Sequence, residues 1–479
     1  MFDFATAAVE GALAAGASYA DARAVVSSSE HLAARDGVLE ALRRGDSAGI
    51  GVRALFGSSW GFFATADLTN ASARRAGEEA AAIAKASARV PGPALELADV
   101  AVRQAHWDSG WQELPSGVST SVKADLLVAA TTGMAAVAGV TVAEASYTAW
   151  DTEKWFVSSQ DHRISQHIVE CGAGMSATAT GESETQRRSY SGMGGHYGTR
   201  GFEIVREADL PGNAERVGEE AVELLSAPMC PAGTTDLILG PEQLGLQVHE
   251  SVGHAIELDR ILGWEAAFAG TSFLDLGQLG RFRYGSELMN ITADATLPHA
   301  LGSFGFDDEG TPSQRVDIVR DGVWVGVLSG RDSAAIAGVA PGGMVRADGY
   351  SRLPMVRMTN VGLLPGASSL DEMIAETGDG IYMETNRSWS IDDKRLNFQF
   401  GCEVGREIKD GRLGRVLRNP SYTGITPQFW ASLDMLGGPD EWLFWGTPNC
   451  GKGQPMQTGH TGHPAVPARF RDVRVGVAR

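Results

Sequence analysis

Cysteine is scarce in this sequence, and long apolar runs are missing from it. The four cysteines among its 479 residues are Cys171, Cys230, Cys402 and Cys450, and no two of them form a CxxC pair. So few cysteines, so far apart, exclude a disulfide-rich scaffold and favour a reducing compartment, so we expect a cytoplasmic protein. No run approaches the roughly 18 consecutive apolar residues of a transmembrane helix, so we expect no membrane insertion.

Positive charge is also in short supply. Lys and Arg number 40 against 59 Asp and Glu, which gives a formal net charge of −19. Such a chain repels phosphate backbones, so we expect no nucleic-acid partner. The N-terminal segment carries Asp3 and Glu10 and lacks a basic region, so we expect no secretion signal. Disorder is disfavoured too, because 43% of the residues are hydrophobic and can form a core.

The first half of the chain alternates between helical and strand-like segments. Residues 21–65 are rich in Val, Leu, Phe and Trp, with Gly37, Gly45 and Gly57 as interruptions, which indicates an antiparallel meander. Thr69 or Asn70 is a suitable N-cap for the helix that follows. Pro91-Gly92-Pro93 then breaks the pattern. The helices predicted in this half lie at 4–16, 71–88, 120–138 and 213–226.

The second half begins after a turn-rich segment, 228–233. A short strand over 234–240 leads into a helix that opens at Pro241, a position where proline is favoured because its missing N–H would have no partner. The remainder is glycine-rich and mostly strand-like, with helices predicted near 369–377 and 427–436.

The chain is too long for one small core, and its pattern mixes helices with runs of strands. We therefore predict an α+β protein of two lobes, with antiparallel sheets and flanking helices. Residues 1–226 are expected to form the N-terminal part. Residues 227–479 are expected to form a C-terminal catalytic lobe that holds a metal.

The motif His249-Glu250-Ser251-Val252-Gly253-His254 carries the clearest chemistry. Neutral imidazoles bind zinc, and a carboxylate beside the first histidine can take a proton from a metal-activated water. This combination predicts a hydrolytic zinc site with Glu250 as the general base.

The two histidines of this motif are five residues apart, whereas the familiar HExxH pattern places them four apart. In an ideal α-helix, four residues bring side chains within about 40° of one another, but five leave them about 140° apart. A π-bulge adds one residue to a turn and would realign them, and Gly253 lies where such a distortion costs least. We therefore predict a distorted helix at His249–His254.

A catalytic zinc needs a third protein ligand. Cys450 lies in TPNCGKGQP, which we expect to be a polar, glycine-rich loop, where a thiol is less easily explained by packing. His460 and His463 are rival donors three residues apart, and Glu257 and Asp259 follow the motif on its own helix. The residues alone leave this choice open.

Four blocks of the second half, taken in their order and spacing, resemble the TldD branch of the TldD/PmbA metallopeptidases. The blocks are HESVGHAIELD at 249–259, DDEGTPSQ at 307–314, LPMVRMTNVGLLPG at 353–366 and CGKGQP at 450–455. DARAV at 21–25, RDGVLE at 35–40 and GIGVRALFGSSWGFFAT at 49–65 are similar to that family's first domain. The resemblance covers nearly the whole chain.

The resemblance implies a zinc-dependent peptidase that acts on peptides and unstructured polypeptides, with one Zn²⁺ per catalytic chain. It implies that His249, His254 and Cys450 are the metal ligands and Glu250 the base. The family also has a branch that lacks HExxxH, and the two types commonly pair. Because this chain retains the motif, we expect the catalytic type, either as a homodimer or as a heterodimer with a related chain lacking HExxxH.

Other readings of the same residues remain. One is a metal-dependent amidase acting on small substrates, and another is a non-catalytic or regulatory subunit of a TldD/PmbA-type heterodimer. Four residues are further candidates for contacts to substrate: Asn360, Asn449, His460 and His463. For Asn360 a purely structural role at a strand end is an equal alternative.

Overall fold

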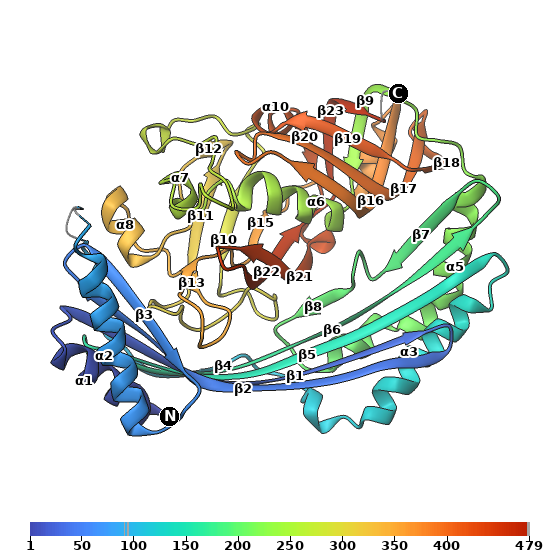
Figure 1. Cartoon of the computed structure of the whole chain (residues 1–479). Coiled ribbons are helices and arrows are strands. Elements are labelled where there is room, and N and C mark those ends of the chain that lie inside the picture. The colour runs from blue at the N-terminus through green and yellow to red at the C-terminus, as the bar shows by residue number, and fades with distance from the viewer. Residues whose placement is uncertain (91, 93–94, 477–479) are drawn as a thin grey trace.

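The computed structural model describes residues 1–90, 92 and 95–476 (Figure 1). The break expected at Pro91 and Pro93 lies outside the described residues. The helices are α1 Phe2–Ala14, α2 Asn70–Ser87, α3 Thr120–Ala135, α4 Glu203–Ala208, α5 Leu210–Ser226, α6 Pro241–Val248, α7 Leu258–Ile261, α8 Arg331–Ala337, α9 Leu370–Ala375 and α10 Thr426–Ala431, with a π turn η2 at His249–Gly253 and 3₁₀ turns η1 Pro115–Gly117, η3 Leu276–Gln278 and η4 Pro439–Glu441.

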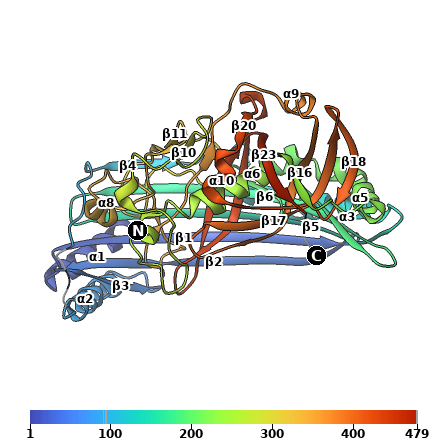
Figure 2. The same cartoon turned by 90° about the horizontal axis from the view of Figure 1, so that it is seen from above.

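The N-terminal half is built on one sheet in the order β3-β2-β1-β5-β6-β4, with β7 and β8 also paired to β6. Its four central strands are 17–19 residues long and run side by side across the molecule (Figure 2). The strands are β1 Tyr19–Arg35, β2 Val38–Phe56, β3 Ser59–Thr65, β4 Gln104–Asp108, β5 Val140–Ser158, β6 Arg163–Thr180, β7 Thr185–Tyr190 and β8 His196–Gly198.

Helices cover the two ends of this sheet and form separate cores there. α1 and α2 pack against the end where β3 lies, and α3 and α5 pack at the other end (Figure 1). Thr69 caps α2 through a hydrogen bond from the Ser72 amide, as its sequence context predicted. Gly45, which lies inside β2, does not interrupt the meander.

The C-terminal half holds a closed barrel. β16, β9, β23, β19 and β17 are hydrogen-bonded in that order, and β17 returns to β16, while β18 and β20 flank the ring. The strands are β9 Gly233–Leu239, β16 Asp379–Ile391, β17 Asn397–Lys409, β18 Arg412–Arg418, β19 Ser421–Ile425, β20 Leu433–Leu436 and β23 Ala468–Val475.

Smaller sheets lie beside the barrel, between it and the long N-terminal sheet (Figure 1). One has the order β12-β11-β10-β15, and two are hairpins, β13-β14 and β21-β22. The strands are β10 Ile291–Asp294, β11 Arg315–Arg320, β12 Val323–Trp324, β13 Val345–Arg346, β14 Met355–Val356, β15 Val361–Leu363, β21 Leu443–Lys452 and β22 Gln457–Ala465.

The predicted α+β class, with antiparallel sheets and flanking helices, is confirmed; the parallel exceptions among named strands are the pairs β4–β6 and β16–β9. The helix predicted over 427–436 is wrong in its second half. α10 ends at Ala431, and Leu433–Leu436 instead pairs with β23, because the barrel gives this segment a partner that local sequence does not reveal.

Buried ion pairs join the two halves. Arg53 on β2 binds Asp21 at 2.6 Å and Glu309 at 3.0 Å, and Arg23 on β1 binds Asp308 at 3.3 Å. All five side chains are at most 5% exposed. Burying charges costs desolvation energy, so such pairs specify how the halves dock more than they add net stability. No helix in the described part of the chain is long and apolar enough to cross a membrane.

Candidate metal centre

The helix that begins at Pro241 changes geometry at the metal motif. α6 runs to Val248 and continues into a π turn over His249–Gly253, where the amide of His254 donates to the carbonyl of His249, five residues back, at 3.1 Å. The predicted distortion is confirmed. The distortion brings the centroids of the His249 and His254 imidazole rings to 4.8 Å from one another.

Gly253 allows the π turn to pack closely against the strand segment behind it. A Cβ at this position would lie 2.1 Å from the sulfur of Met358. The apolar residues of the same helix, Leu244, Val248 and Val252, are fully buried in the main core. Because that face is fixed in the core, the opposite face of the helix, which carries His249 and Glu250, is held in place.

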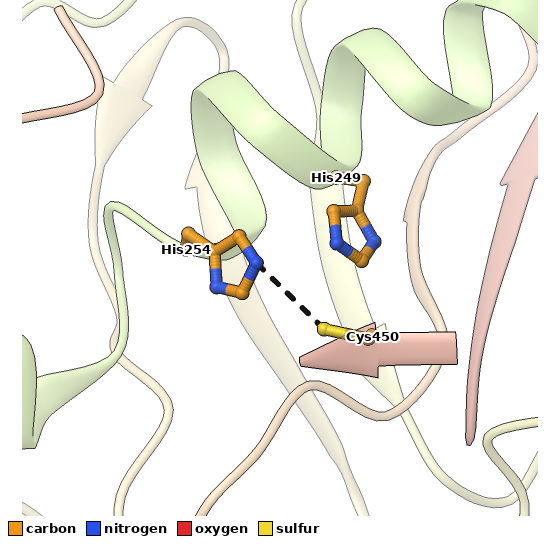
Figure 3. Close-up of side chains that lie close together, drawn as sticks. All are labelled: His249, His254 and Cys450. Atoms are coloured by element: carbon orange, nitrogen blue, oxygen red, sulfur yellow. Dashed lines mark hydrogen bonds between the residues drawn. The ribbon is translucent and has the colours of Figure 1, made fainter. Parts of the chain in front are cut away.

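Cys450 approaches the two histidines from β21 (Figure 3). Its Sγ lies 3.7 Å from Nε2 of His254, and the three potential ligand atoms lie within 4.8 Å of one another. Each of the three side chains is 4% exposed. The sequence suggested a loop here, but the residue is part of the β21–β22 hairpin, where Cys450 is opposite Gly459.

His249 is oriented by a second histidine. The Nδ1 of His463 lies 3.0 Å from the carbonyl oxygen of Val361, which can only accept, so Nδ1 of His463 carries the proton. Its Nε2 is therefore an acceptor, and it takes the hydrogen bond from Nδ1 of His249 at 2.7 Å. This leaves the Nε2 lone pair of His249 free for a metal ion.

His254 is oriented by a carboxylate. Its Nδ1 donates to Glu257 at 2.9 Å, which leaves Nε2 directed at Cys450. Glu257 is itself held by Lys452 at 3.4 Å, and Lys452 also binds Asp259 at 2.8 Å. Lys452 and Glu257 are fully buried. Ligand histidines typically carry such an outer hydrogen bond, so both imidazoles have the arrangement of metal ligands.

The electrostatics of the cluster favour the forms that bind metal. Burial lowers the pKa values of His249 and His254, which keeps both imidazoles neutral. Burial alone would raise the pKa of the Cys450 thiol, but the neighbouring His254 and Arg357 outweigh it and lower the value. A low thiol pKa favours the thiolate, which is the form that binds a metal.

Glu250 lies on the same helix face and is paired with an arginine. Its Oε2 accepts from Nη1 of Arg395 at 2.5 Å, and its side chain is 7% exposed. Arg395 has a left-handed backbone, φ +65°, in the turn between β16 and β17. The amide of Arg395 donates to the carbonyl of Asp392 at 2.9 Å. The hydroxyl of Thr426 donates to the carbonyl of Arg395 at 2.8 Å. The turn thus fixes the arginine against the carboxylate.

A cavity of about 690 Å³ opens in front of this cluster. His249, Glu250, His254 and Cys450 all line it. Its other lining residues include aromatics, glycines and charged side chains, among them Met193, Gly194, Gly195, Tyr197, Trp389, Trp445, Pro448, Asn449, Arg187, Glu242 and Arg395. The cluster is therefore reachable from a groove of limited size.

The donor set fits a metal ion. Two imidazole nitrogens and one thiolate sulfur match the ligands of a zinc site with an open fourth position. All three atoms are buried, and their one competing intramolecular bond is the contact between His254 and Cys450. Within the described residues, this is the one place where three such groups converge. Thiolate and imidazole together favour zinc over magnesium or calcium.

The other residues singled out from the sequence lie in different places. Asn449 is exposed and lines the cavity. His460 bonds to Glu170 at 2.8 Å and contacts Trp150, away from this cavity. Asn360 is fully buried, and its amide bonds to Gly302, Asp294 and Ser303.

Sequence reasoning did not find Arg395 or Trp389, which lie 145 and 139 residues beyond the motif's Glu250. No local pattern marks them. The positive φ of Arg395 is a structural signal that a sequence does not display.

Comparisons with known proteins identify the family of this chain. Three consecutive family models match the chain: PmbA/TldA metallopeptidase domain 1 at residues 20–84, the central domain at 113–227 and the C-terminal domain at 232–476. A Methanothermobacter thermautotrophicus protein named metalloprotease is 31% identical over 459 residues, which cover 96% of this chain and 95% of that protein.

Two further relatives bear on the metal and on the fold. A zinc metalloprotease TldD homologue of Saccharolobus solfataricus is 28% identical over 206 residues, 43% of this chain and 44% of that protein. The crystal structure of TldE from Thermococcus kodakarensis has the same fold, with a TM-score of 0.72 at 15% identity, and covers 98% of this chain and 99% of that one.

Proposed function

Because the chain belongs to the PmbA/TldA metallopeptidase family, we propose that it is a zinc-dependent peptidase that hydrolyses peptides or unstructured polypeptides. One observation carries the proposal. His249, His254 and Cys450 converge within 4.8 Å, and Glu250 lies on the wall of the same cavity. These are the parts of a hydrolytic zinc site.

In this proposal His249 and His254 bind one Zn²⁺ through Nε2, and Cys450 binds it through its thiolate. Support comes from the hydrogen bonds that His463 and Glu257 make to the opposite ring nitrogens. When bound, the ion supplies a Lewis acid that polarises the substrate carbonyl and makes water more acidic.

Glu250 is the general base. Its Oε2 is occupied by Arg395, so Oε1 is the atom left to accept a proton from the attacking water. The same atom then returns that proton to the leaving amine. Arg395 acts as a positioning residue, because its bond fixes the carboxylate at the cavity wall.

The cavity determines which chains can reach the site. A folded domain of 100 residues has a radius of gyration of about 13 Å, so its volume far exceeds the roughly 690 Å³ of the cavity. An extended segment fits, and we propose that Asn449, which is exposed on β21 and lines the cavity, bonds its backbone. We therefore propose that the substrate is a flexible peptide or an unfolded polypeptide.

Assembly and location are part of the same proposal. We propose a dimer, either of this chain with itself or with a related chain that lacks HExxxH; the shared fold with TldE supports the second form. We propose a cytoplasmic location, and all four cysteines are free and buried, which suits it.

We also propose that the boundary between the two lobes lies between residues 226 and 227. The N-terminal sheet ends by Gly198, and β9 starts at Gly233.

The proposal is tested by hydrolysis of an unstructured polypeptide, with products identified by mass spectrometry. The wild type should cleave it, lose activity to a chelator and regain activity with zinc but not with magnesium. Glu250→Gln should not cleave it. Cleavage of small amides alone would indicate an amidase, and a zinc-loaded chain that cleaves neither would indicate a non-catalytic subunit.

A further inference from the structure

The cavity follows one face of the motif helix, and a second carboxylate lies at its far end. Glu242, Leu246, His249 and Glu250 all line it, at the spacing that places residues on one helix face. Seven residues separate Glu242 from His249, roughly 10 Å along the helix axis. That length equals about three residues of extended peptide.

Glu242 has little compensation for its charge. Its Oε1 accepts a hydrogen bond from the amide of Met193 at 2.9 Å, and the hydroxyl of Thr385 is its other hydrogen-bonding neighbour. Among the described residues no Lys, Arg or His nitrogen lies within 4 Å of its carboxylate. The loop over it is close: a Cβ on Gly192, φ +80°, would lie 2.7 Å from Cδ of Glu242 and 2.1 Å from the Trp445 ring.

The surroundings of Glu242 are acidic. Arg188 acts on its charge but is already bound to Glu220 at 2.7 Å, to Glu384 at 3.0 Å and to Glu403 at 3.7 Å. Arg187 also lines the cavity, and it donates a hydrogen bond to Ser176 at 3.0 Å. Burial raises the pKa of Glu242 to about 7, and Glu403 adds to the rise against the effect of Arg188. A cation that binds beside Glu242 would therefore offset the charge of this carboxylate.

We propose that Glu242 is a specificity-determining residue that binds a positively charged group of the substrate, about three residues from the bond that is cleaved. This rests on the proposed peptidase function. The group is an ammonium or guanidinium, supplied by a Lys or Arg side chain or by a free peptide N-terminus. Trp445 borders the same spot, and one face of its ring is stacked on His196, with 5.0 Å between the ring centroids.

Equilibrium binding tests this without turnover. The protein is the zinc-loaded Glu250→Gln variant, and the probes are fluorescent ten-residue Ala/Ser peptides, blocked at both ends, with one Lys moved through each position. A matched set carries Gln in place of Lys, and a third set has no Lys but a free N-terminus. A buried charged hydrogen bond is worth at least about tenfold in affinity.

We expect one Lys position, or the free N-terminus, to tighten binding at least about tenfold over its matched peptide. Adding Glu242→Gln should abolish the preference. Adding Glu287→Gln, which removes an equal charge from an acid 84% exposed, should preserve it. Whether the Lys set or the free N-terminus set responds identifies the source of the charge.

Three results would overturn the inference: an equal gain at every Lys position, a preference that survives Glu242→Gln, or no binding of any peptide. Its failure is distinct from failure of the proposed function. A Lys preference that depends on Glu242, in a wild type that cleaves no peptide, would refute the peptidase and keep the binding site. Cleavage of peptides by the wild type, without any Lys or N-terminus preference in binding, would support the peptidase and refute the binding site at Glu242.

Discussion

Nδ1 of His249 lies 2.7 Å from Nε2 of His463, and this hydrogen bond determines which nitrogen of His249 faces the metal position. His463 is buried, and burial, with His249 beside it, holds its pKa well below the usual value. It therefore stays neutral and keeps its acceptor nitrogen. We therefore propose that His463, a rival ligand by its sequence, instead supports His249 as a ligand.

Replacing His463 should weaken metal binding without removing a ligand. In His463→Ala the imidazole of His249 loses its partner, and loss of such a support typically costs 10- to 100-fold in metal affinity. Competition with a fluorescent zinc chelator measures it. His460→Ala is the matched control, because His460 bonds to Glu170 and not to a ligand. Equal losses in both variants would remove the special role of His463.

Glu250 and Arg395 should be separable by kinetics. Glu250→Gln should bind zinc as the wild type does and lose turnover, because an amide cannot take the proton. Arg395→Ala should retain zinc and some activity, with a fall mainly in kcat, because the carboxylate is present but no longer fixed. Metal content and steady-state rates measure both. Full activity in Glu250→Gln would contradict the general-base role.

Lys452 should contribute strongly to stability. Its ammonium is fully buried between Asp259 and Glu257, so Lys452→Met leaves two carboxylates without their cation. Removing one partner of a buried ion pair costs about 3–5 kcal/mol. Thermal unfolding of the metal-free protein measures this as a lower melting temperature. Lys452→Met combined with Asp259→Leu should recover part of the loss; no loss in the single variant would contradict the account.

Acid should weaken the same cluster. Burial alone would raise the pKa of Glu257, but Lys452 and His254 outweigh it and hold the value well below normal. A carboxylate whose pKa is depressed in the folded state stabilises the fold above its unfolded pKa, about 4.3. That contribution is lost as the pH falls below this value. Glu257→Gln should be less stable at pH 7 and should show a smaller further loss of stability as the pH falls from about 5 to about 3.

Binding of a cationic peptide should strengthen as pH rises through 7. The pKa of Glu242 is about 7, raised by burial, with Glu403 adding to the rise and Arg188 opposing it. Between pH 6 and pH 8 its ionised fraction therefore grows roughly tenfold, while a Lys side chain stays charged. The ratio of affinities for the Lys peptide and its Gln partner should grow accordingly. A ratio that is flat with pH would contradict this assignment.

Local patterns in the sequence were enough for the motif helix and its distortion. A spacing of five residues between His249 and His254 conflicts with 3.6 residues per turn, and the π turn resolves that conflict. The N-cap at Thr69 and the meander of β1, β2 and β3 follow from equally local signals.

Long-range contacts were beyond those patterns. β1 pairs with β5, more than a hundred residues later, so strands far apart in the sequence form one sheet. His463 and Arg395 meet the motif across 214 and 145 residues. Alternating hydrophobicity tells which face of a strand is buried but not which strand is its neighbour, so such partners emerge only in three dimensions.

Metal content tests the central claim most directly. Zinc is measured by elemental analysis in the purified wild type and in Cys450→Ser, with Cys402→Ser as a control for loss of a buried thiol outside the cluster. We predict about one zinc per chain in the wild type and in the control, and little or none in Cys450→Ser. Zinc retained in full without the Cys450 thiol, or no zinc in the wild type after it is supplied, would contradict the His₂Cys site.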